Sequence, residues 1–301
     1  MTATRRLGST DLKIAPLVLG GNVFGWTADK AESFAVLDAF VAAGGTMIDT
    51  ADVYSAWVPG HQGGESETVI GEWLRASGKR DAVLIATKVG MLPVDGEKLA
   101  PANIAAACDA SLRRLGTDRI DLYYAHQDDE SVPQDDVLAA FGKLIDAGKV
   151  RVIGASNFTA ARLKSAVDLS RDGTLPRYHV LQPEYNLVSR KAYEGELQAF
   201  CAAENVAALP YYGLAAGFLT GKYRSADDLA KSVRSRSAKD QLEGNGPAVL
   251  AAIALAWLTA QAGVCAPIAS ARTVDQLPDL IASLTLELGE DQLARLTNAG
   301  A

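Results

Sequence analysis

Four side chains whose types suit proton transfer stand at the ends of three apolar runs. Asp49 ends the first run, and Tyr54 follows it five residues later. Lys88 ends the second run and His126 ends the third. A carboxylate, a phenol, an ammonium and an imidazole can form one charged, hydrogen-bonded cluster around a carbonyl oxygen.

Such a cluster contains the groups that the reduction of a carbonyl requires. When a hydride adds to the carbonyl carbon, an alkoxide forms and must receive a proton. Tyr54, with an ordinary pKa near ~10, is too weak an acid unless a neighbouring cation stabilises its phenolate. We predict that Lys88 lowers the pKa of Tyr54, because an opposite charge lowers the pKa of an acid by ~1–3 units, and that Asp49 keeps Lys88 charged and oriented. We also predict that His126 donates a hydrogen bond to the substrate oxygen.

Each of these four residues also has a purely structural explanation. Asp49 could cap a helix, and Tyr54 could be a packed aromatic. Lys88 could be a solvated charge, and His126 could satisfy loop carbonyls. The joint occurrence of all four types at the ends of successive strands is much harder to explain in this way, so the set favours a catalytic site.

The elements that must position this site alternate along the chain as short β-rich runs and longer amphipathic segments. Strands are predicted at residues 17–19, 47–49, 83–86, 120–124, 150–155, 179–182, 207–211 and 264–268. Helices are predicted at residues 29–43, 65–76, 102–115, 135–147, 159–169, 192–204, 247–259, 273–281 and 290–298. Thr159 is expected to cap its helix, and Thr273 to Gln276 has the spacing of a capping box.

Eight strand–helix units in a row predict a single α/β domain over residues 1–301, a (β/α)8 TIM barrel. A hairpin is expected to precede the barrel, within residues 4–14, and extra C-terminal helices to follow it. Residues 222–246 form the main irregular segment, too long for a simple connection. In such a barrel the C-terminal strand ends converge on the active site, which would bring the four candidate residues together.

Composition excludes several classes of protein. The formal charge of −7 argues against nucleic-acid partners, which need a basic surface. No apolar run approaches the ~20 residues of a membrane span, and the first residues lack a signal-peptide core. Three widely spaced cysteines in apolar settings are typical of buried thiols in a reducing compartment, and no metal site is expected. We therefore expect a cytoplasmic protein without membrane partners; the choice between monomer and homo-oligomer stays open.

Further motifs in chain order carry a resemblance to a known family. They are the opening segments 4–8 and 17–21, residues 64–67, Gly154 to Phe158, Gln182 to Asn186, and the segment from Leu214 to Tyr223. Together with Asp49, Tyr54, Lys88 and His126, they resemble the aldo-keto reductases over about 270 residues. The resemblance implies a (β/α)8 barrel, hydride transfer from a nicotinamide cofactor to an aldehyde or ketone, and a small-molecule carbonyl substrate.

The resemblance also implies which residues bind the cofactor. Ser156, Asn157 and Gln182 would hold the nicotinamide carboxamide, and Tyr211 would stack on its ring. Arg272, just after the last strand, would bind the 2′-phosphate of NADP(H), because a guanidinium binds phosphate bidentately. The remaining predicted contacts are Gly21, Tyr212, Gly213, Leu214, Ala216, Leu219, Lys222, Ser270, Gln276 and Asp279.

The sequence departs from the family pattern at three places. Tyr212 stands where the family usually has a serine, so Tyr211 and Tyr212 could exchange roles. Leu280 falls where an adenine-contacting asparagine is expected, and Ser270 stands where glycine is common. These departures concern the cofactor site and leave the barrel prediction unchanged.

The substrate is the least determined part of the prediction. Trp26 and Trp57 are expected to line the mouth of the site, where indoles suit an aromatic carbonyl or the apolar face of a sugar. Two other functions are compatible with part of the pattern: a lyase or aldolase with Lys88 as a Schiff-base amine, and a cofactor-sensing regulatory subunit. The cofactor motifs argue against the first, and the complete set of four residues argues against the second.

Overall fold

A computed structural model describes residues 4–92, 98–220 and 251–299. Within these ranges eight parallel strands form one curled sheet with the neighbour order β10-β3-β4-β5-β6-β7-β8-β9. The strands are β3 (Val18–Gly20), β4 (Met47–Asp49), β5 (Leu84–Val89), β6 (Ile120–Ala125), β7 (Val150–Ser156), β8 (Tyr178–Gln182), β9 (Ala207–Ala208) and β10 (Ile268–Ala269). Ala208 forms a parallel bridge with Val264, and Cys265 N donates to Ala208 O at 2.9 Å. These bonds join the two ends of the sheet into the predicted (β/α)8 barrel.

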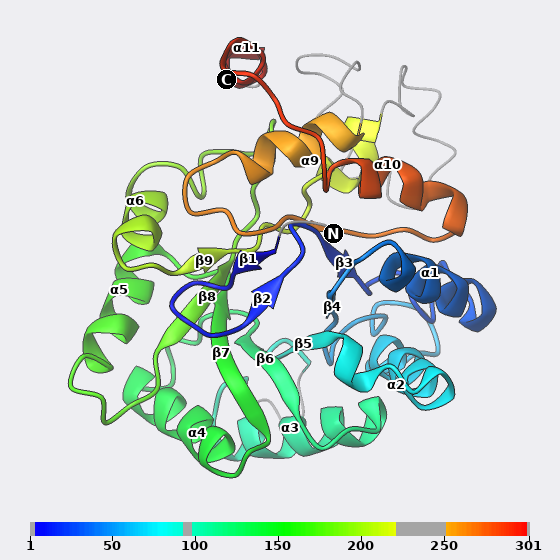
Figure 1. The fold of residues 1–301 in the computed structure, drawn as a ribbon. Coiled ribbons are helices and arrows are strands. Elements are labelled where there is room, and N and C mark those ends of the chain that lie inside the picture. The colour runs from blue at the N-terminus through cyan, green and yellow to red at the C-terminus, as the bar shows by residue number, and fades with distance from the viewer. Residues whose placement is uncertain (1–3, 93–97, 221–250, 300–301) are drawn as a thin grey trace.

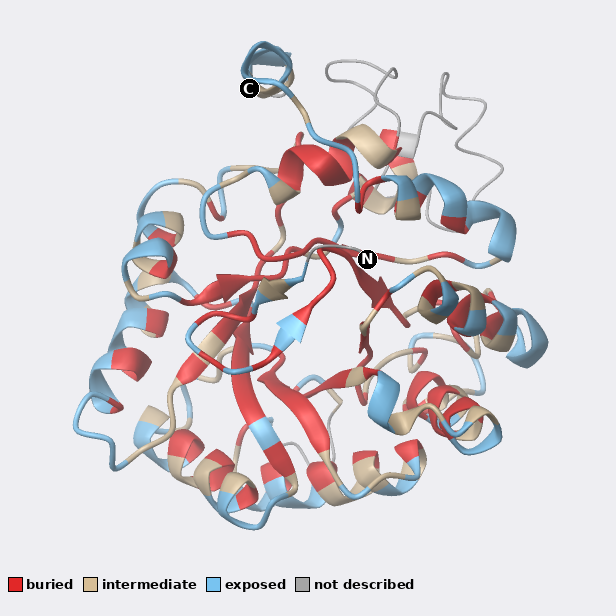
Figure 2. Ribbon diagram, viewed as in Figure 1, coloured by how far each residue is buried: buried red, intermediate tan, exposed pale blue. Residues whose placement is uncertain are grey.

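Helices surround the strands on the outside (Figure 1). Each strand of the sheet is followed by an α-helix, and in chain order the first described helices after the eight strands are α1 (Lys30–Ala42), α2 (Glu65–Ser77), α3 (Pro101–Leu115), α4 (Gln134–Asp146), α5 (Ala160–Leu169), α6 (Glu196–Ala203), α9 (Ala251–Thr259) and α10 (Leu277–Ala282). Their inner faces are buried and their outer faces are exposed (Figure 2). Among the described residues no helix is long and apolar enough to cross a membrane.

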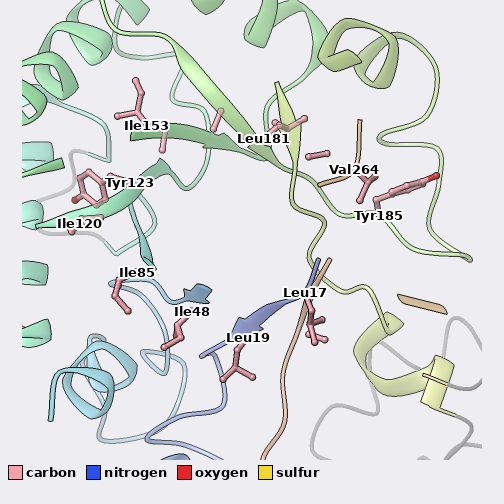
Figure 3. Close-up of a cluster of buried hydrophobic side chains, with 14 of the residues drawn as sticks. Leu17, Leu19, Ile48, Ile85, Ile120, Tyr123, Ile153, Leu181, Tyr185 and Val264 are labelled. Carbon is pink, nitrogen blue, oxygen red and sulfur yellow. The ribbon is translucent and has the colours of Figure 1, made fainter. Parts of the chain in front are cut away.

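Two hydrophobic cores lie on the two sides of the barrel wall. Because side chains alternate along a strand, neighbouring residues belong to different cores. Ile48 packs in the layer between strands and helices, while Met47 packs inside the barrel. Ile153 and Leu181 belong to the outer layer (Figure 3), and Val152 to the inner one.

The predicted hairpin closes one end of the barrel. Its strands β1 (Arg5–Arg6) and β2 (Lys13–Ile14) pair antiparallel and lie across the opening in Figure 1. Leu7, Leu12 and Ile14 complete the inner core. Gly8 has φ +58°, and a Cβ there would lie 2.6 Å from the carbonyl oxygen of His179, so the turn requires glycine. Among the described residues, the hairpin therefore fills the interior at this end and leaves the other end open.

Several boundaries differ from prediction for local reasons. The strands predicted at 207–211 and 264–268 contain Pro210 and Pro267, which lack ladder donors, and only β9 and β10 are regular there. The helix predicted from residue 192 begins at Glu196, after Gly195 with φ 92°.

The helix predicted at 273–281 consists of a 3-10 turn, η3 (Val274–Gln276), followed by α10, which begins beside Pro278. The expected capping box is not formed, because the side chain of Thr273 makes no cap bond and Gln276 Oε1 accepts from Arg272 N instead, at 3.0 Å. The Thr159 cap is present, with its side chain accepting from Arg162 N.

The predicted irregular segment 222–246 lies outside the described residues, as does Lys222. The last helix, α11 (Glu290–Ala299), follows α10 at the edge of the molecule (Figure 1). Thr297 attaches it to the barrel, since its hydroxyl accepts from Trp257 Nε1 at 3.0 Å and its carbonyl from Arg190 Nη1 at 2.6 Å.

Candidate active site

Strand alternation carries the predicted catalytic side chains into the barrel. Met47 of β4 and Ala86 of β5 face the interior, so Asp49 and Lys88, two residues further along, also face it. The same spacing turns His126 inward after β6. Because the strands are parallel, these positions meet at the end opposite the hairpin.

The ammonium of Lys88 is the centre of the cluster. Its Nζ donates to Asp49 Oδ2 at 2.6 Å, to the Thr50 carbonyl at 2.7 Å and to the Tyr54 hydroxyl oxygen at 2.8 Å. Lys88 is fully buried. An ammonium has three hydrogens to donate, and each of them has an acceptor here, so the geometry matches the charged form.

The expected lowering of the pKa of Tyr54 is not what the structure gives. Burial, and after it the carboxylate of Asp49, raises the pKa of Tyr54 well above its ordinary value. Burial also lowers the pKa of Lys88, an effect that Asp49 opposes. The prediction counted the attraction of the cation and omitted the cost of placing a phenolate in an apolar surrounding next to a carboxylate. Tyr54 is therefore held in its protonated form.

His126 faces the same point of the interior as Tyr54. Their rings meet edge to face, with centroids 6.1 Å apart. Burial and the positive charge of Lys88 lower the pKa of His126 well below its ordinary value, so the imidazole is neutral at neutral pH. A neutral imidazole keeps one N–H, so His126 remains able to donate one hydrogen bond.

A second group of polar side chains connects to Asp49 from β7 and β8. Gln182 Nε2 donates to Asp49 Oδ1 at 2.9 Å, and Ser156 Oγ donates to the Gln182 carbonyl at 2.9 Å. Asn157 Nδ2 donates to the His126 carbonyl at 3.0 Å, and Asn157 Oδ1 accepts from the Tyr211 hydroxyl at 2.9 Å. The residues predicted to hold the carboxamide thus form one network with the catalytic candidates.

A cavity of about 800 Å³ opens above these residues. Predicted site residues make up much of its lining: Trp26, Asp49, Tyr54, Trp57, His126, Ser156, Asn157, Gln182, Tyr211, Tyr212, Gly213, Leu214, Ala216, Ser270, Arg272, Gln276 and Asp279. Lys88 is not part of the lining and lies behind Tyr54 and Asp49, to which it is hydrogen-bonded. Gly21 and Leu219 do not line the cavity either, since Gly20 takes the first position and Leu219 is buried in the outer core.

Part of the cavity wall is a turn with unusual backbone angles. Tyr212, Ala215, Ala216 and Gly217 have φ of 55°, 46°, 54° and 95°. No described residue supplies an acceptor for the backbone N–H groups of Leu214 and Ala216, which both line the cavity. Concave backbone of this kind binds anions through its amides.

The segment after β10 forms another part of the wall. The exposed Arg272 makes no ion pair with the described part of the chain. Asp275 and Asp279 line the same cavity, so both signs of charge are present. The hydroxyl of Ser270, a predicted cofactor contact, donates to Asn22 Oδ1 at 2.7 Å.

Aromatic side chains frame the side of the cavity near Tyr54. The ring of Trp57 meets that of Trp26 at 5.5 Å and that of Tyr54 at 6.2 Å, both edge to face. Trp57, Met91 and Tyr212 are large apolar side chains that remain 50%, 41% and 44% exposed. This rim offers flat apolar surface directly beside the phenol.

Sequence reasoning missed several lining residues, including Asn22, Met91 and Asp275. Asp275 lies inside the stretch predicted to form a capping box, for which only a structural role is expected. Asn22 and Met91 each follow a strand, β3 and β5, by two residues, and this position at a C-terminal strand end is the signal that could have found them.

Comparison with known proteins agrees with this geometry. Residues 16–301 match the model of the aldo/keto reductase family. The norsolorinic acid reductase stcV of Emericella nidulans is 32% identical over 311 residues, covering 94% of this chain and 77% of that protein. Protein tas of Escherichia coli is 33% identical over 331 residues, covering 97% and 95%, and the uncharacterized oxidoreductase YrpG of Bacillus subtilis is 32% identical over 313 residues, covering 97% and 94%. The chain belongs to the aldo/keto reductase family, whose members reduce carbonyls with a nicotinamide cofactor.

Proposed function

We propose that this protein reduces aldehydes or ketones to alcohols with NADPH, using Tyr54 as the general acid. The observation that carries the proposal is the bonding of Lys88, which donates to both Tyr54 and Asp49 at the floor of the cavity. The bound nicotinamide would supply a hydride to the carbonyl carbon. The protein's own part is to orient the carbonyl and to protonate its oxygen.

Tyr54 is suited to give up its proton only when a strong base forms beside it. Its raised pKa keeps the hydroxyl protonated until an alkoxide develops on the substrate. The hydroxyl lies 3.4 Å from Asp49 Oδ2, too far for a strong bond, so its hydrogen can turn to the substrate oxygen. Once the proton has left, the ammonium of Lys88 at 2.8 Å stabilises the phenolate. His126 donates the second hydrogen bond to the same oxygen.

The residues around the cavity fit a dinucleotide. The amides of Leu214 and Ala216 have no acceptor among the described residues and suit a pyrophosphate. Amide and hydroxyl groups lie beside Asp49 on Ser156, Asn157 and Gln182. A nicotinamide carboxamide could take the place of the hydrogen bonds that these groups now make with one another and with Asp49. Tyr211 offers a ring next to them. The same full bonding of Lys88 disfavours the Schiff-base alternative, which requires a free amine.

Replacing Tyr54 by phenylalanine tests the acid. We expect Tyr54→Phe to lower kcat for 4-nitrobenzaldehyde by about a hundredfold to ten-thousandfold, because the proton donor is lost. The affinity for NADPH, measured by fluorescence titration, should change little. Tyr123→Phe is the matched control, since it removes a buried hydroxyl from the outer side of the wall. Full turnover by Tyr54→Phe would exclude Tyr54 as the acid.

Arg272 carries the proposed preference for NADPH. A charge-assisted hydrogen bond contributes about 1.5–3 kcal/mol, so Arg272→Ala should weaken NADPH binding by about tenfold or more and NADH binding far less. The comparison of the two cofactors is decisive because Asp275 and Asp279 line the same cavity as Arg272. If these carboxylates rather than Arg272 contacted the ribose, they would favour the free hydroxyls of NADH over the 2′-phosphate of NADPH. Arg113→Ala, at an exposed arginine of α3, serves as the control. An unchanged ratio of NADPH to NADH affinity in Arg272→Ala would remove Arg272 from the phosphate site.

A further inference from the structure

Asp52 is a buried carboxylate that the proposed mechanism does not use. It lies in the turn between β4 and Tyr54, has 2% exposure and does not line the cavity. Its backbone N–H lies 3.4 Å from the carbonyl oxygen of Lys88, which places the turn against the end of β5. Its Oδ1 is buried and has no hydrogen-bond partner among the residues that the structure describes. A buried carboxylate oxygen without a donor is costly when it is charged.

The nearby cation is already engaged by another acid. Arg114 of α3 bonds Glu67 Oε2 of α2 at 2.6 Å, and Thr87 Oγ1 donates to Glu67 Oε1 at 2.6 Å. Glu67 is fully buried, and its carboxylate neutralises the positive charge of Arg114. The charge of Glu67 then acts on Asp52 as a second negative charge in the same apolar surrounding.

Lys88 of β5 and Tyr123 of β6 are two further titratable groups that Asp52 affects. Burial and Glu67 raise the pKa of Asp52 to about 8, while Arg114, the backbone amide of Val53 and Lys88 act in the opposite direction. The attraction is mutual, because an ionised Asp52 raises the pKa of Lys88. Asp52 thus stands on the outer side of β5 with one acid, Glu67, beside it and the catalytic ammonium within electrostatic reach.

We propose that Asp52 is a positioning residue that holds a proton behind the catalytic cluster and sets the alkaline limit of carbonyl reduction through Lys88. With Asp52 neutral, the charges of Asp49 and Lys88 balance, and the ammonium is available to a phenolate on Tyr54. When Asp52 releases its proton to water, it adds a negative charge near Lys88. That charge opposes the transfer of the Tyr54 proton to the substrate oxygen. This inference rests on the proposed function.

The variant Asp52→Asn tests the proposal, because an amide copies the neutral acid and cannot ionise. Single-turnover hydride transfer to 4-nitrobenzaldehyde is measured with saturating NADPH from about pH 6 to about pH 9.5. In the wild type, the rate should fall about tenfold or more with a midpoint near the pKa of Asp52, about 8. In Asp52→Asn, this fall should be absent or moved upward by at least one pH unit. Asp118→Asn, which removes an exposed carboxylate beside Arg119, should keep the wild-type profile.

A wild-type profile in Asp52→Asn would overturn the proposal and assign the alkaline fall to Lys88 or Tyr54 themselves. The proposed function would survive that result, because turnover itself would remain. If neither protein turned over any carbonyl, the proposed function would fail instead, and thermal unfolding would decide whether Asp52 holds its proton.

Thermal unfolding reports the proton of Asp52 without any need for activity. The pKa of Asp52 is about 8 in the folded protein and ~3.9 in the unfolded chain. The free energy of unfolding of the wild type therefore falls as the pH rises between these two values. The Tm of Asp52→Asn minus that of the wild type should therefore grow over this range, while the difference for Asp118→Asn stays level. A constant difference for Asp52→Asn would mean that Asp52 is ionised in the folded protein and would refute the proposal.

Discussion

At the scale of single residues, Asp49 joins the two halves of the site. One carboxylate oxygen accepts from Lys88 and the other from Gln182, so the proposed proton-transfer side and the proposed carboxamide side share one group. A movement of the Gln182 side chain is therefore expected to shift the Asp49 carboxylate and, with it, the ammonium of Lys88. The two oxygens of a carboxylate stand at a fixed angle to each other. Asp49 therefore also fixes how Lys88 and Gln182 are placed relative to one another.

Substitution of Trp57 tests where the carbonyl substrate binds. It is half exposed and meets both Trp26 and Tyr54 edge to face. We predict that Trp57→Ala lowers kcat/KM for bulky aromatic aldehydes by roughly threefold to tenfold, because an aromatic pair contributes about 0.5–1.5 kcal/mol. Small aliphatic aldehydes should be affected less, and Trp57→Phe should retain most of the activity. Equal losses for large and small substrates in steady-state kinetics would remove Trp57 from the substrate site.

Residue types and strand ends were enough to predict that Asp49, Tyr54, Lys88 and His126 come together. The electrostatics could not be predicted in the same way. The pKa of Tyr54 depends on how deeply the phenol is buried, and the environment of Asp52 depends on a pair between Glu67 of α2 and Arg114 of α3. These contacts bring together residues distant in the chain, and no local pattern announces them.

At the scale of elements, the end of the barrel away from the cavity is held by a charged centre. Asp121, at the start of β6, accepts from Ile85 N of β5 at 2.9 Å and from Arg80 Nη2 at 2.8 Å. Its other oxygen accepts from Arg151 Nη1 of β7 at 3.0 Å. One buried carboxylate thus bonds to groups on both neighbouring strands, which keeps three strands in register.

We predict that Asp121→Ala lowers the free energy of unfolding by about 3 kcal/mol, because a backbone amide and two guanidinium groups lose their acceptor. Arg151 is 39% exposed, so much of the cost should come from Ile85 and Arg80. Urea unfolding measures the loss, and Asp118→Asn is the exposed control. The KM for NADPH should stay near the wild-type value, since the cavity lies at the opposite end. A loss below about 1 kcal/mol would show that water replaces these bonds.

The elements themselves followed the sequence pattern most closely where apolar runs lack proline. The predicted boundaries of β4 agree with the structure, and those of α2 differ by one residue. Prediction failed where proline or glycine interrupts the regular backbone: Pro210 and Pro267 lack a ladder donor and shorten the last two strands, and Gly195, with φ 92°, delays the start of α6. Hydrophobic periodicity does not record these losses, because proline and glycine change the backbone without changing the apolar pattern.

At the scale of the whole molecule, the two ends of the barrel have separate tasks. The hairpin and Asp121 stabilise one end, and the strands point their functional side chains toward the other. Substitutions at the first end should therefore change stability with little effect on turnover. Substitutions at the second should do the reverse.

The wall between these ends is uneven around its circumference. At 7 residues β7 is long, whereas β9 and β10 have 2 residues each and close the sheet through a few bonds beside prolines. Local opening is easiest where backbone bonds are few. In deuterium exchange, the amides of Ala208 and Cys265 should therefore take up label ahead of those in β5, β6 and β7. Uniform uptake would mean that the barrel opens only as a unit; a gradient would identify the β9–β10 seam as the place where the ring of strands first parts.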